Sequence, residues 1–269
     1  MRPVGAISRI MGFAVAVAAF VATTHVQAAA EQNEAVVRGV RGTANYSTDR
    51  GSNWKDLKVG TKLKQSSVIR TAPGGTVDLF LGDNGPVVRV TENTTMGIDR
   101  LTIDRSGVEK IIETQLDLRS GRILGNVKKL AAASKYEVKT PQGVAGIRGT
   151  RYDISADGRV SITEGDAMAV YVIGGRTSTG RVGAGQTIRP PTVAGGEPTV
   201  TPIPPSEIST INGMIDDAGR GGSTPTDVGP TTILTINPII EQFPNAGDRA
   251  KIETTIETST PVETNTNEE

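Results

Sequence analysis

Cysteine is absent from the chain, and the single histidine is His25. His25 lies within residues 1–30, which have the pattern of a secretory signal peptide because Arg2 and Arg9 precede an apolar run too short to span a membrane comfortably. Once this segment is cleaved, near residue 29 or 31, the mature chain has neither residue type. That excludes Ser-His-Asp and Cys-His catalysis, disulfide bonds, and zinc sites with nitrogen or sulfur ligands.

Aromatic residues are scarce, at 3% of the chain, and no second stretch is as apolar as the signal segment. Scarce aromatics argue against sugar-binding platforms and, with export and the lack of a binding motif, against nucleic acid. We expect an exported protein, periplasmic or at the cell surface, with no membrane span in the mature chain. We expect no cofactor, no metal ion and no catalytic residue.

The formal net charge of zero conceals two oppositely charged segments. Residues 31–189 carry 24 Lys and Arg against 17 Asp and Glu, whereas residues 190–269 carry 3 against 12 and hold 11 of the 15 prolines. Both changes coincide near residue 190, so we place a domain boundary there. The expected organisation is a signal peptide at 1–30, a β domain at 31–189 and a largely disordered acidic tail at 190–269, in which residues 208–215 have the pattern of a brief helix.

Alternating apolar residues and turn signals predict strands throughout the middle segment. Residues 76–81 and 86–91 read as a hairpin around the Gly-Asp-Asn-Gly turn at 82–85. Residues 136–165 combine strand, glycine turn and hairpin within thirty residues. The sequence therefore predicts an all-β fold, an antiparallel β-sandwich or jelly-roll-like domain. The only tryptophan, Trp54, is expected in its core.

The register of one hairpin follows from its apolar positions. A three-residue loop ending in Gly158 pairs Ile154 with Val160 and Tyr152 with Ile162, which places all four on one face. A two-residue loop would move Val160 to the opposite face. We therefore predict the three-residue loop, with Gly158 in a left-handed conformation.

A short motif occurs twice, as Gly-Val-Arg-Gly-Thr at residues 39–43 and Gly-Ile-Arg-Gly-Thr at residues 146–150. We interpret the two copies as similar bends at which glycine lets a strand pass from one sheet to the other. The spacing of Gly143, Gly146 and Gly149 is superficially that of a phosphate-binding loop, but such loops precede a helix and here a strand is expected.

Several segments resemble the FecR domain family over roughly residues 36–189. These segments are Leu57-Lys58-Val59-Gly60 with Leu63, Val68-Ile69-Arg70-Thr71, residues 76–81, Leu118-Arg119-Ser120-Gly121-Arg122-Ile123, Tyr136-Glu137-Val138-Lys139-Thr140-Pro141, Gly149-Thr150-Arg151-Tyr152 and Ile162-Thr163-Glu164-Gly165. The resemblance implies an all-β domain without enzymatic activity, found in envelope signalling proteins and in free exported proteins. The signalling members resemble transmembrane regulators with a cytoplasmic N-terminal segment, where this chain has a cleavable signal.

Four arginines flank the two glycine motifs: Arg38, Arg41, Arg148 and Arg151. If they converge, they form a basic patch able to hold an anionic envelope polymer, an acidic envelope protein or the chain's own tail. The alternative is a scattered, solvated surface. The same two interpretations apply to the lysines at positions 55, 58, 62 and 64.

An enzyme is the least favoured hypothesis. Asp153 and Glu164, with Asp78 or Asp83, are the carboxylates that a glycosidase-like acid pair would need, but no spacing supports that chemistry. The sequence instead favours a non-catalytic exported β module that binds a protein or ligand in envelope signalling or sensing. A structural or surface-assembly protein of the envelope is the alternative, and no oligomeric state is specified.

Overall fold

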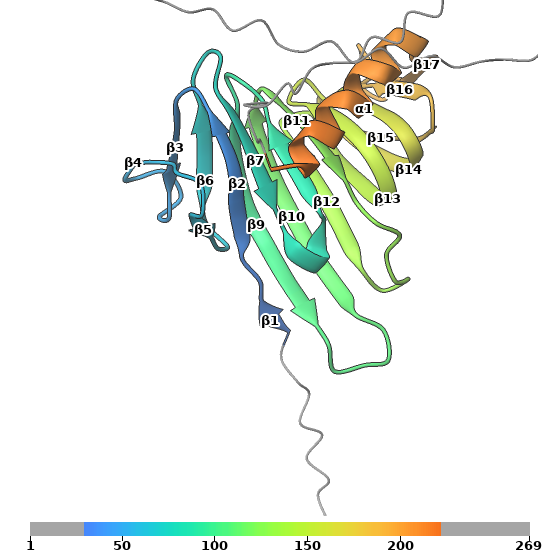
Figure 1. Cartoon of the computed structure of the whole chain (residues 1–269). Helices are drawn as coiled ribbons and strands as arrows, with labels where there is room; N and C mark the ends of the chain where they lie inside the picture. Colours follow the sequence, from blue (N-terminus) through green and yellow to red (C-terminus); the bar gives the residue numbers. More distant parts are fainter. Residues whose placement is uncertain (1–29, 222–269) are drawn as a thin grey trace, which may run out of the picture. The chain divides into compact units, whose positions relative to one another are not determined.

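The computed structural model describes residues 30–221, and Figure 1 shows their arrangement. The expected signal peptide and residues 222–269 of the expected tail lie outside these residues. The described strands form one connected sheet, accompanied by α1 (Pro205–Gly219) and by the 3-10 turn η1 (Gly82–Asn84). The predicted all-β class is confirmed.

The sheet curls into two layers. In order of pairing, the first layer contains β4 (Lys55–Asp56), β3 (Ala44–Ser47), β6 (Val68–Thr71), β9 (Thr95–Asp104), β10 (Ile111–Ser120), β12 (Lys135–Thr140), the first half of β13 (Gly143–Ser155), the second half of β14 (Val160–Ile173) and β15 (Arg176–Gly183), with β1 (Glu31–Gln32) beside β9.

The second layer contains β5 (Lys62–Leu63), β2 (Ala35–Arg41), β7 (Thr76–Phe80), β8 (Val87–Val90), β11 (Arg122–Asn126), the second half of β13, the first half of β14, β16 (Gln186–Arg189) and β17 (Thr199–Pro202). The antiparallel prediction holds for all of these pairs except β10–β12, which is parallel.

The chain passes between the layers along a line of left-handed backbone positions. These positions, all with positive φ, are Gly42, Gly74, Asn93, Gly121, Gly149 and Gly165. Backbone hydrogen bonds join neighbouring crossings, as from Ala72 N–H to the Thr43 carbonyl (3.0 Å) and from Asn93 N–H to the Ala72 carbonyl (3.4 Å). The repeated motif therefore marks two bends between layers, as predicted, at Gly42 (φ 64°) and Gly149 (φ 68°).

The hairpin between β13 and β14 has the predicted register. Tyr152 lies opposite Ile162 and Ile154 lies opposite Val160, and all four side chains are buried. Gly158 has φ 88°, and its N–H donates to the carbonyl of Ser155. The β7–β8 hairpin is also confirmed, with η1 in its loop.

The main core lies between the two layers. It includes Tyr136 and Tyr152, whose hydroxyls are 2.9 Å apart, and burial raises the pKa of both. Trp54 is not part of it: this side chain is half-buried and lies under the guanidinium of Arg70, 4.1 Å from the ring centroid. The core prediction for Trp54 is wrong because this residue directly precedes β4, which lies at the sheet edge.

The ordered chain continues past the boundary expected near residue 190. β17 pairs with β16, and α1 packs on the second layer through a small apolar cluster. The acidic, proline-rich composition that marked a tail thus includes one strand and a fifteen-residue helix. No helix within residues 30–221 is long and apolar enough to cross a membrane.

The bend at Gly165 gives a direct test of the layer crossing. A Cβ at this position would lie 2.3 Å from the carbonyl oxygen of Gly149, and φ is 83°. We expect Gly165→Ala to lower the free energy of unfolding in urea by about 1–3 kcal/mol or more. Gly146→Ala is the matched control, because its Cβ would meet nothing closer than 3.8 Å. Equal stability of the two variants would contradict this account.

Candidate functional site

A row of buried side chains crosses the outer face of the second layer. Cross-strand pairing aligns Asp78, Arg89, Leu124, Asp153, Ser161 and Thr187, one from each of β7, β8, β11, β13, β14 and β16. Their neighbours along each strand point into the main core, so this row faces the other way. All six are nonetheless buried, and α1 contacts five of these strands. The site is therefore a largely polar layer between sheet and helix.

Arg89 joins the sheet to the helix. Its Nε and Nη2 donate to the two carboxylate oxygens of Asp78 at 2.6 and 2.8 Å, and Nη2 also donates to Asp217 of α1 at 2.8 Å. Burial alone would lower the pKa of Arg89, but the bonds to Asp78 and Asp217 outweigh it and raise the pKa. Asp217 also accepts from Arg41 at 3.0 Å. The bonds from Arg89 and Arg41 lower the pKa of Asp217 despite partial desolvation.

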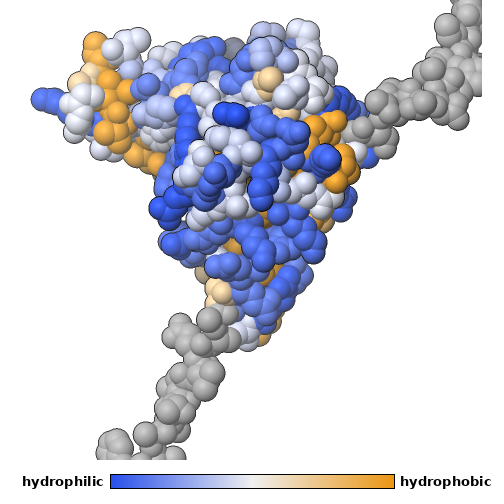
Figure 2. All heavy atoms as spheres, turned by 90° about the vertical axis from the view of Figure 1, so that its left-hand side faces the viewer, coloured by the Kyte–Doolittle hydropathy of each residue, from blue (hydrophilic) through white to orange (hydrophobic). Residues whose placement is uncertain are grey.

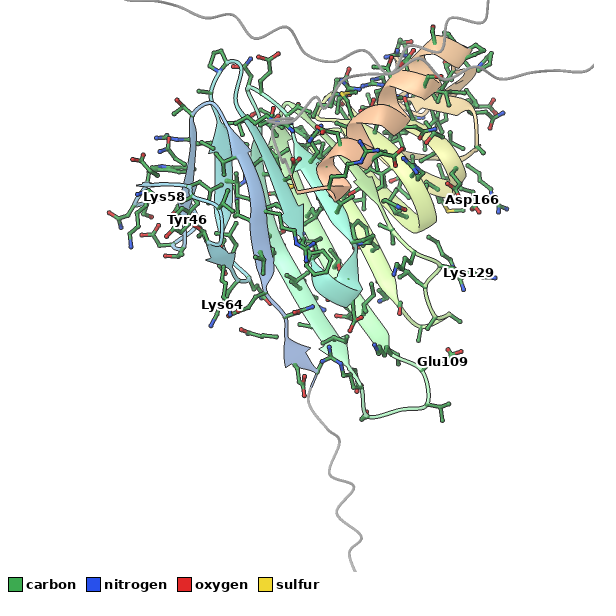
Figure 3. All side chains as sticks on the ribbon, in the orientation of Figure 1. Tyr46, Lys58, Lys64, Glu109, Lys129 and Asp166 are labelled. Atoms are coloured by element: carbon green, nitrogen blue, oxygen red, sulfur yellow. The ribbon has the colours of Figure 1, made fainter. Side chains whose placement is uncertain are left out.

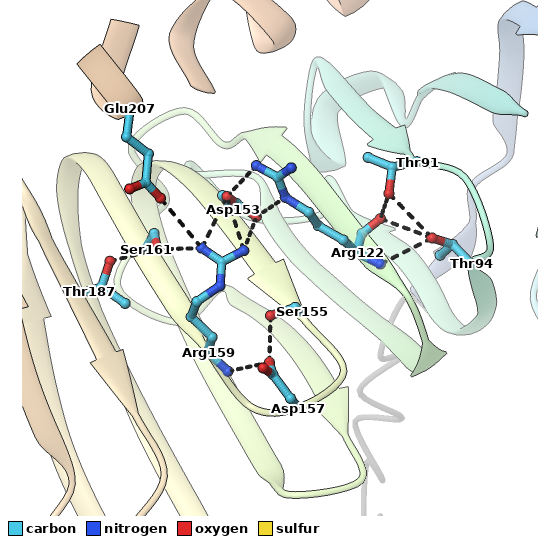
Figure 4. Close-up of polar contacts among 10 residues, drawn as sticks. All are labelled: Thr91, Thr94, Arg122, Asp153, Ser155, Asp157, Arg159, Ser161, Thr187 and Glu207. Carbon is cyan, nitrogen blue, oxygen red and sulfur yellow. Dashed lines mark hydrogen bonds and ion pairs between the residues drawn. The ribbon is translucent and has the colours of Figure 1, made fainter. Parts of the chain in front are cut away.

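Asp153 is the second anionic centre, and Figure 4 shows its partners. This fully buried carboxylate accepts from Arg122 at 2.7 and 2.6 Å and from Arg159 at 3.3 Å. The bidentate bond to Asp153 raises the pKa of Arg122. Arg159 also donates to Ser161 at 2.9 Å and lies 3.9 Å from Glu207 of α1. Two guanidinium groups therefore neutralise one buried carboxylate and still face the helix.

Arg151 holds the middle of α1. It donates to Asp216 at 2.5 Å and to the carbonyl of Asn212 at 3.1 Å, while its own Nε is buried without a partner. The Asn212 side chain in turn accepts from Thr163 at 2.7 Å. These bonds fix the rotation of the helix over the sheet.

Apolar contacts also hold α1 on the second layer. Ile211, Ile215 and Ala218 pack on Val87 and Leu124, forming a cluster separate from the main core. We call the surface beneath α1 the arginine groove, with Val87 and Leu124 as its floor and Arg41, Arg89, Arg122, Arg151 and Arg159 as its charged side chains.

The structure brings together only part of the predicted basic patch. Arg41 and Arg151 both bind α1, as described. Arg38 lines a cavity next to the helix, and its guanidinium lies 3.8 Å from the centroid of Phe80. Arg148 is exposed on the first layer and does not join them. The chain's own acidic segment therefore occupies the part of the patch that forms.

The predicted lysine cluster lies elsewhere. Figure 3 places Lys58 and Lys64 on the β3–β5 side, away from α1. Lys62 and Lys64 approach Glu34 at 3.3 and 3.2 Å. Figure 2 shows that this side of the molecule is mostly hydrophilic, with small apolar patches. The lysines thus form a solvated surface rather than a convergent patch.

The carboxylates considered for acid–base chemistry each have a different setting. Asp78 and Asp153 are bound by arginines, and Asp83 is bound by Arg105 at 3.1 Å. Glu164 is exposed near the bend of β14. Within residues 30–221, no group of three His, Asp or Glu side chains is placed to hold a metal ion.

Sequence reasoning missed Arg89, Arg122 and Arg159. One signal was available: the confirmed β7–β8 hairpin places Arg89 opposite Asp78, and both interrupt apolar strands. Opposite charges at such a cross-strand position indicate an ion pair. No comparable signal connects Arg122 or Arg159 to α1, which begins only at Pro205.

A comparison with protein-family models matches the part of the chain that forms most of the groove. The model of the FecR protein family matches residues 67–171, from the start of β6 to within β14. The chain contains a FecR domain. This family is generally non-catalytic. The match includes four of the five groove arginines and ends before α1.

Two solved structures match parts of this chain at low similarity. Both are crystal structures of a candidate anti-sigma factor from Parabacteroides distasonis, at 1.65 and 2.50 Å resolution. The first has 18% identity and a TM-score of 0.39, covering 53% of this chain and 62% of that one. The second has 17% identity and a TM-score of 0.31, covering 52% and 56%. The FecR-domain chain therefore spans about three-fifths of their length, and no curated protein matches it.

The buried Arg89–Asp78 pair provides a stability test. Arg89→Ala leaves Asp78 buried without its cation, and we expect the free energy of unfolding to fall by about 3–5 kcal/mol. Arg100→Ala, in an exposed pair with Glu113, should cost about 0–1 kcal/mol. Replacing both partners, with Asp78→Leu and Arg89→Met, should recover much of the loss in chemical denaturation. A loss for Arg89→Ala no larger than the control would contradict the assignment.

The lowered pKa of Asp217 predicts how α1 responds to acid. A carboxylate with a depressed folded-state pKa contributes stability above its unfolded value, about 3.9, and loses it as pH falls through the folded value. We expect α1 to stay docked from neutral pH to about 5 and to loosen below about 4. A spin label at Ser209→Cys, an exposed position in a chain without native cysteine, would report helix mobility.

Asp217→Asn is the control for this titration. The variant should have a more mobile label at neutral pH and a smaller acid-induced change. An identical acid transition in both chains would show that another group controls the helix.

Proposed function

We propose that this FecR-domain chain is an exported, non-catalytic module that binds a protein in envelope signalling or sensing. The observation that carries the proposal is the arginine groove, which holds an acidic amphipathic helix through arginine–carboxylate bonds and a small apolar floor. Such a surface recognises charge, shape and helical register together, which are the elements of helix-in-groove recognition.

Other observations support parts of this proposal. The FecR family match supports a role in signalling, and the signal-like residues 1–30 support export. The groove carboxylates are held by arginines in bidentate ion pairs, which suits binding better than proton transfer.

Site-specific photo-cross-linking in cells tests this proposal. The full chain would carry a photoreactive residue at position 38, beside the groove, or at position 148, on the other layer, in a bacterium that carries the gene. We expect an envelope-fraction adduct with a second protein from position 38 and little from position 148.

The other outcomes have distinct meanings. Adducts confined to the cytoplasmic fraction would overturn export, and adducts from position 148 alone would place binding on another face. Adducts only between copies of this chain would favour the surface-assembly alternative over signalling.

A further inference from the structure

Helix α1 is not needed to close the main core. The residues that fill the space between the two layers all come from the strands and their connections, and none comes from α1. The apolar contacts of α1 form a separate cluster, in which Ile211, Ile215 and Ala218 are the buried residues of the helix. The helix can therefore leave the groove without exposing the interior of the sandwich.

The helix is also intrinsically weak. It has Gly213 near its middle, three isoleucines, and no side-chain hydrogen bond at its N-cap. Asp216 and Asp217 lie in its last turn, where the negative end of the helix dipole disfavours carboxylates. The groove arginines compensate for these charges. The helical conformation of α1 therefore depends on its contacts with the groove, whereas the strands that form the groove fold around the main core.

Charge in the groove matches what the helix supplies. The five arginines face two sheet carboxylates, Asp78 and Asp153, which leaves three positive charges. Helix α1 brings three carboxylates, Glu207, Asp216 and Asp217. Any other occupant of the groove must supply a similar negative charge, because Asp78 and Asp153 neutralise only two of the five arginines.

The groove is larger than the helix that fills it. A cavity of about 420 Å³ remains beside α1, lined by Arg41, Arg89, Arg122 and Met214 among others. The unpartnered, buried Nε of Arg151 is a second sign of imperfect fit. A different helix could fill this volume and satisfy this donor.

We propose that the arginine groove is a docking site for an acidic amphipathic helix of a protein partner, and that α1 occupies it as an intramolecular substitute that the partner displaces. The proposal deepens the proposed function and rests on it. The partner helix would carry two aliphatic side chains four residues apart followed by an acidic pair, the pattern of Ile211, Ile215, Asp216 and Asp217.

A peptide-binding experiment on the purified mature chain tests this inference. The probe is a fluorescent peptide with the sequence of residues 203–221, measured by anisotropy. The probe can bind only to molecules in which α1 has left the groove. Its apparent affinity is therefore reduced in proportion to the fraction of such molecules. We expect Asp216→Asn with Asp217→Asn in the chain to open the groove and strengthen probe binding by about tenfold or more.

Four changes control for specificity. Arg41→Gln in the opened variant should weaken probe binding, whereas Arg148→Gln, on the other layer, should not. A probe with both aspartates changed to asparagine should bind poorly. Gly213→Ala, where a Cβ meets nothing within 4 Å, should strengthen α1 and reduce probe binding to the opened variant about fivefold.

Hydrogen exchange of the opened variant distinguishes displacement from unfolding. We expect faster exchange in α1 and unchanged protection in β13 and β14. Loss of protection in both layers, or probe binding no tighter than to the unaltered chain, would overturn the inference and make α1 an integral part of the fold. The cross-linking experiment stays independent of this result, because a partner bound at another face would preserve the proposed function while the peptide test failed.

Discussion

The two layers of this domain depend on one line of backbone positions with positive φ, because a strand can turn from one layer into the other only where the chain adopts a left-handed conformation. Glycine occupies five of these positions and Asn93 the sixth. At Gly149 the pairing register of β13 also shifts, so residues on either side of the bend face outward from different layers. The bends thus decide which charged side chains can meet, and they separate Arg148 from Arg151 although only two residues lie between them.

The outer face of the second layer is unusual because it buries charged side chains beside a small apolar floor. Asp78 and Asp153 are almost inaccessible, and each is held by a guanidinium in a bidentate arrangement. Such pairs add little net stability compared with apolar residues of the same volume, but they strongly disfavour occupants of the wrong charge. The main core supplies the stability of the domain, and this face supplies selectivity.

Much of the fold could be read from the sequence where local rules apply. Side-chain parity determined the register of Tyr152 and Ile154 in their hairpin, and the repeated glycine motif predicted two layer crossings. The failures concern tertiary contacts. Composition beyond residue 190 indicated a tail, because an acidic helix with little apolar surface becomes stable only against arginines distant in sequence. Arg41 and Arg151 both contact α1, whereas Arg148 lies on the other side of a bend in β13. Neither this bend nor the packing of α1 on Arg41 follows from local sequence patterns.

The long strands β13 and β14 belong to both layers, and this has a mechanical consequence. The layers cannot separate unless β13 and β14 lose their pairing to the neighbouring strands of one layer, so the two layers form one cooperative unit. Tension applied at residue 221 meets a different structure. It would lift α1 from its ion pairs first and then open the β16–β17 pair at the edge of the sheet, one contact after another. The domain thus combines a rigid sandwich with a C-terminal segment that detaches stepwise. Under tension, exposure of the arginine groove would be the first change.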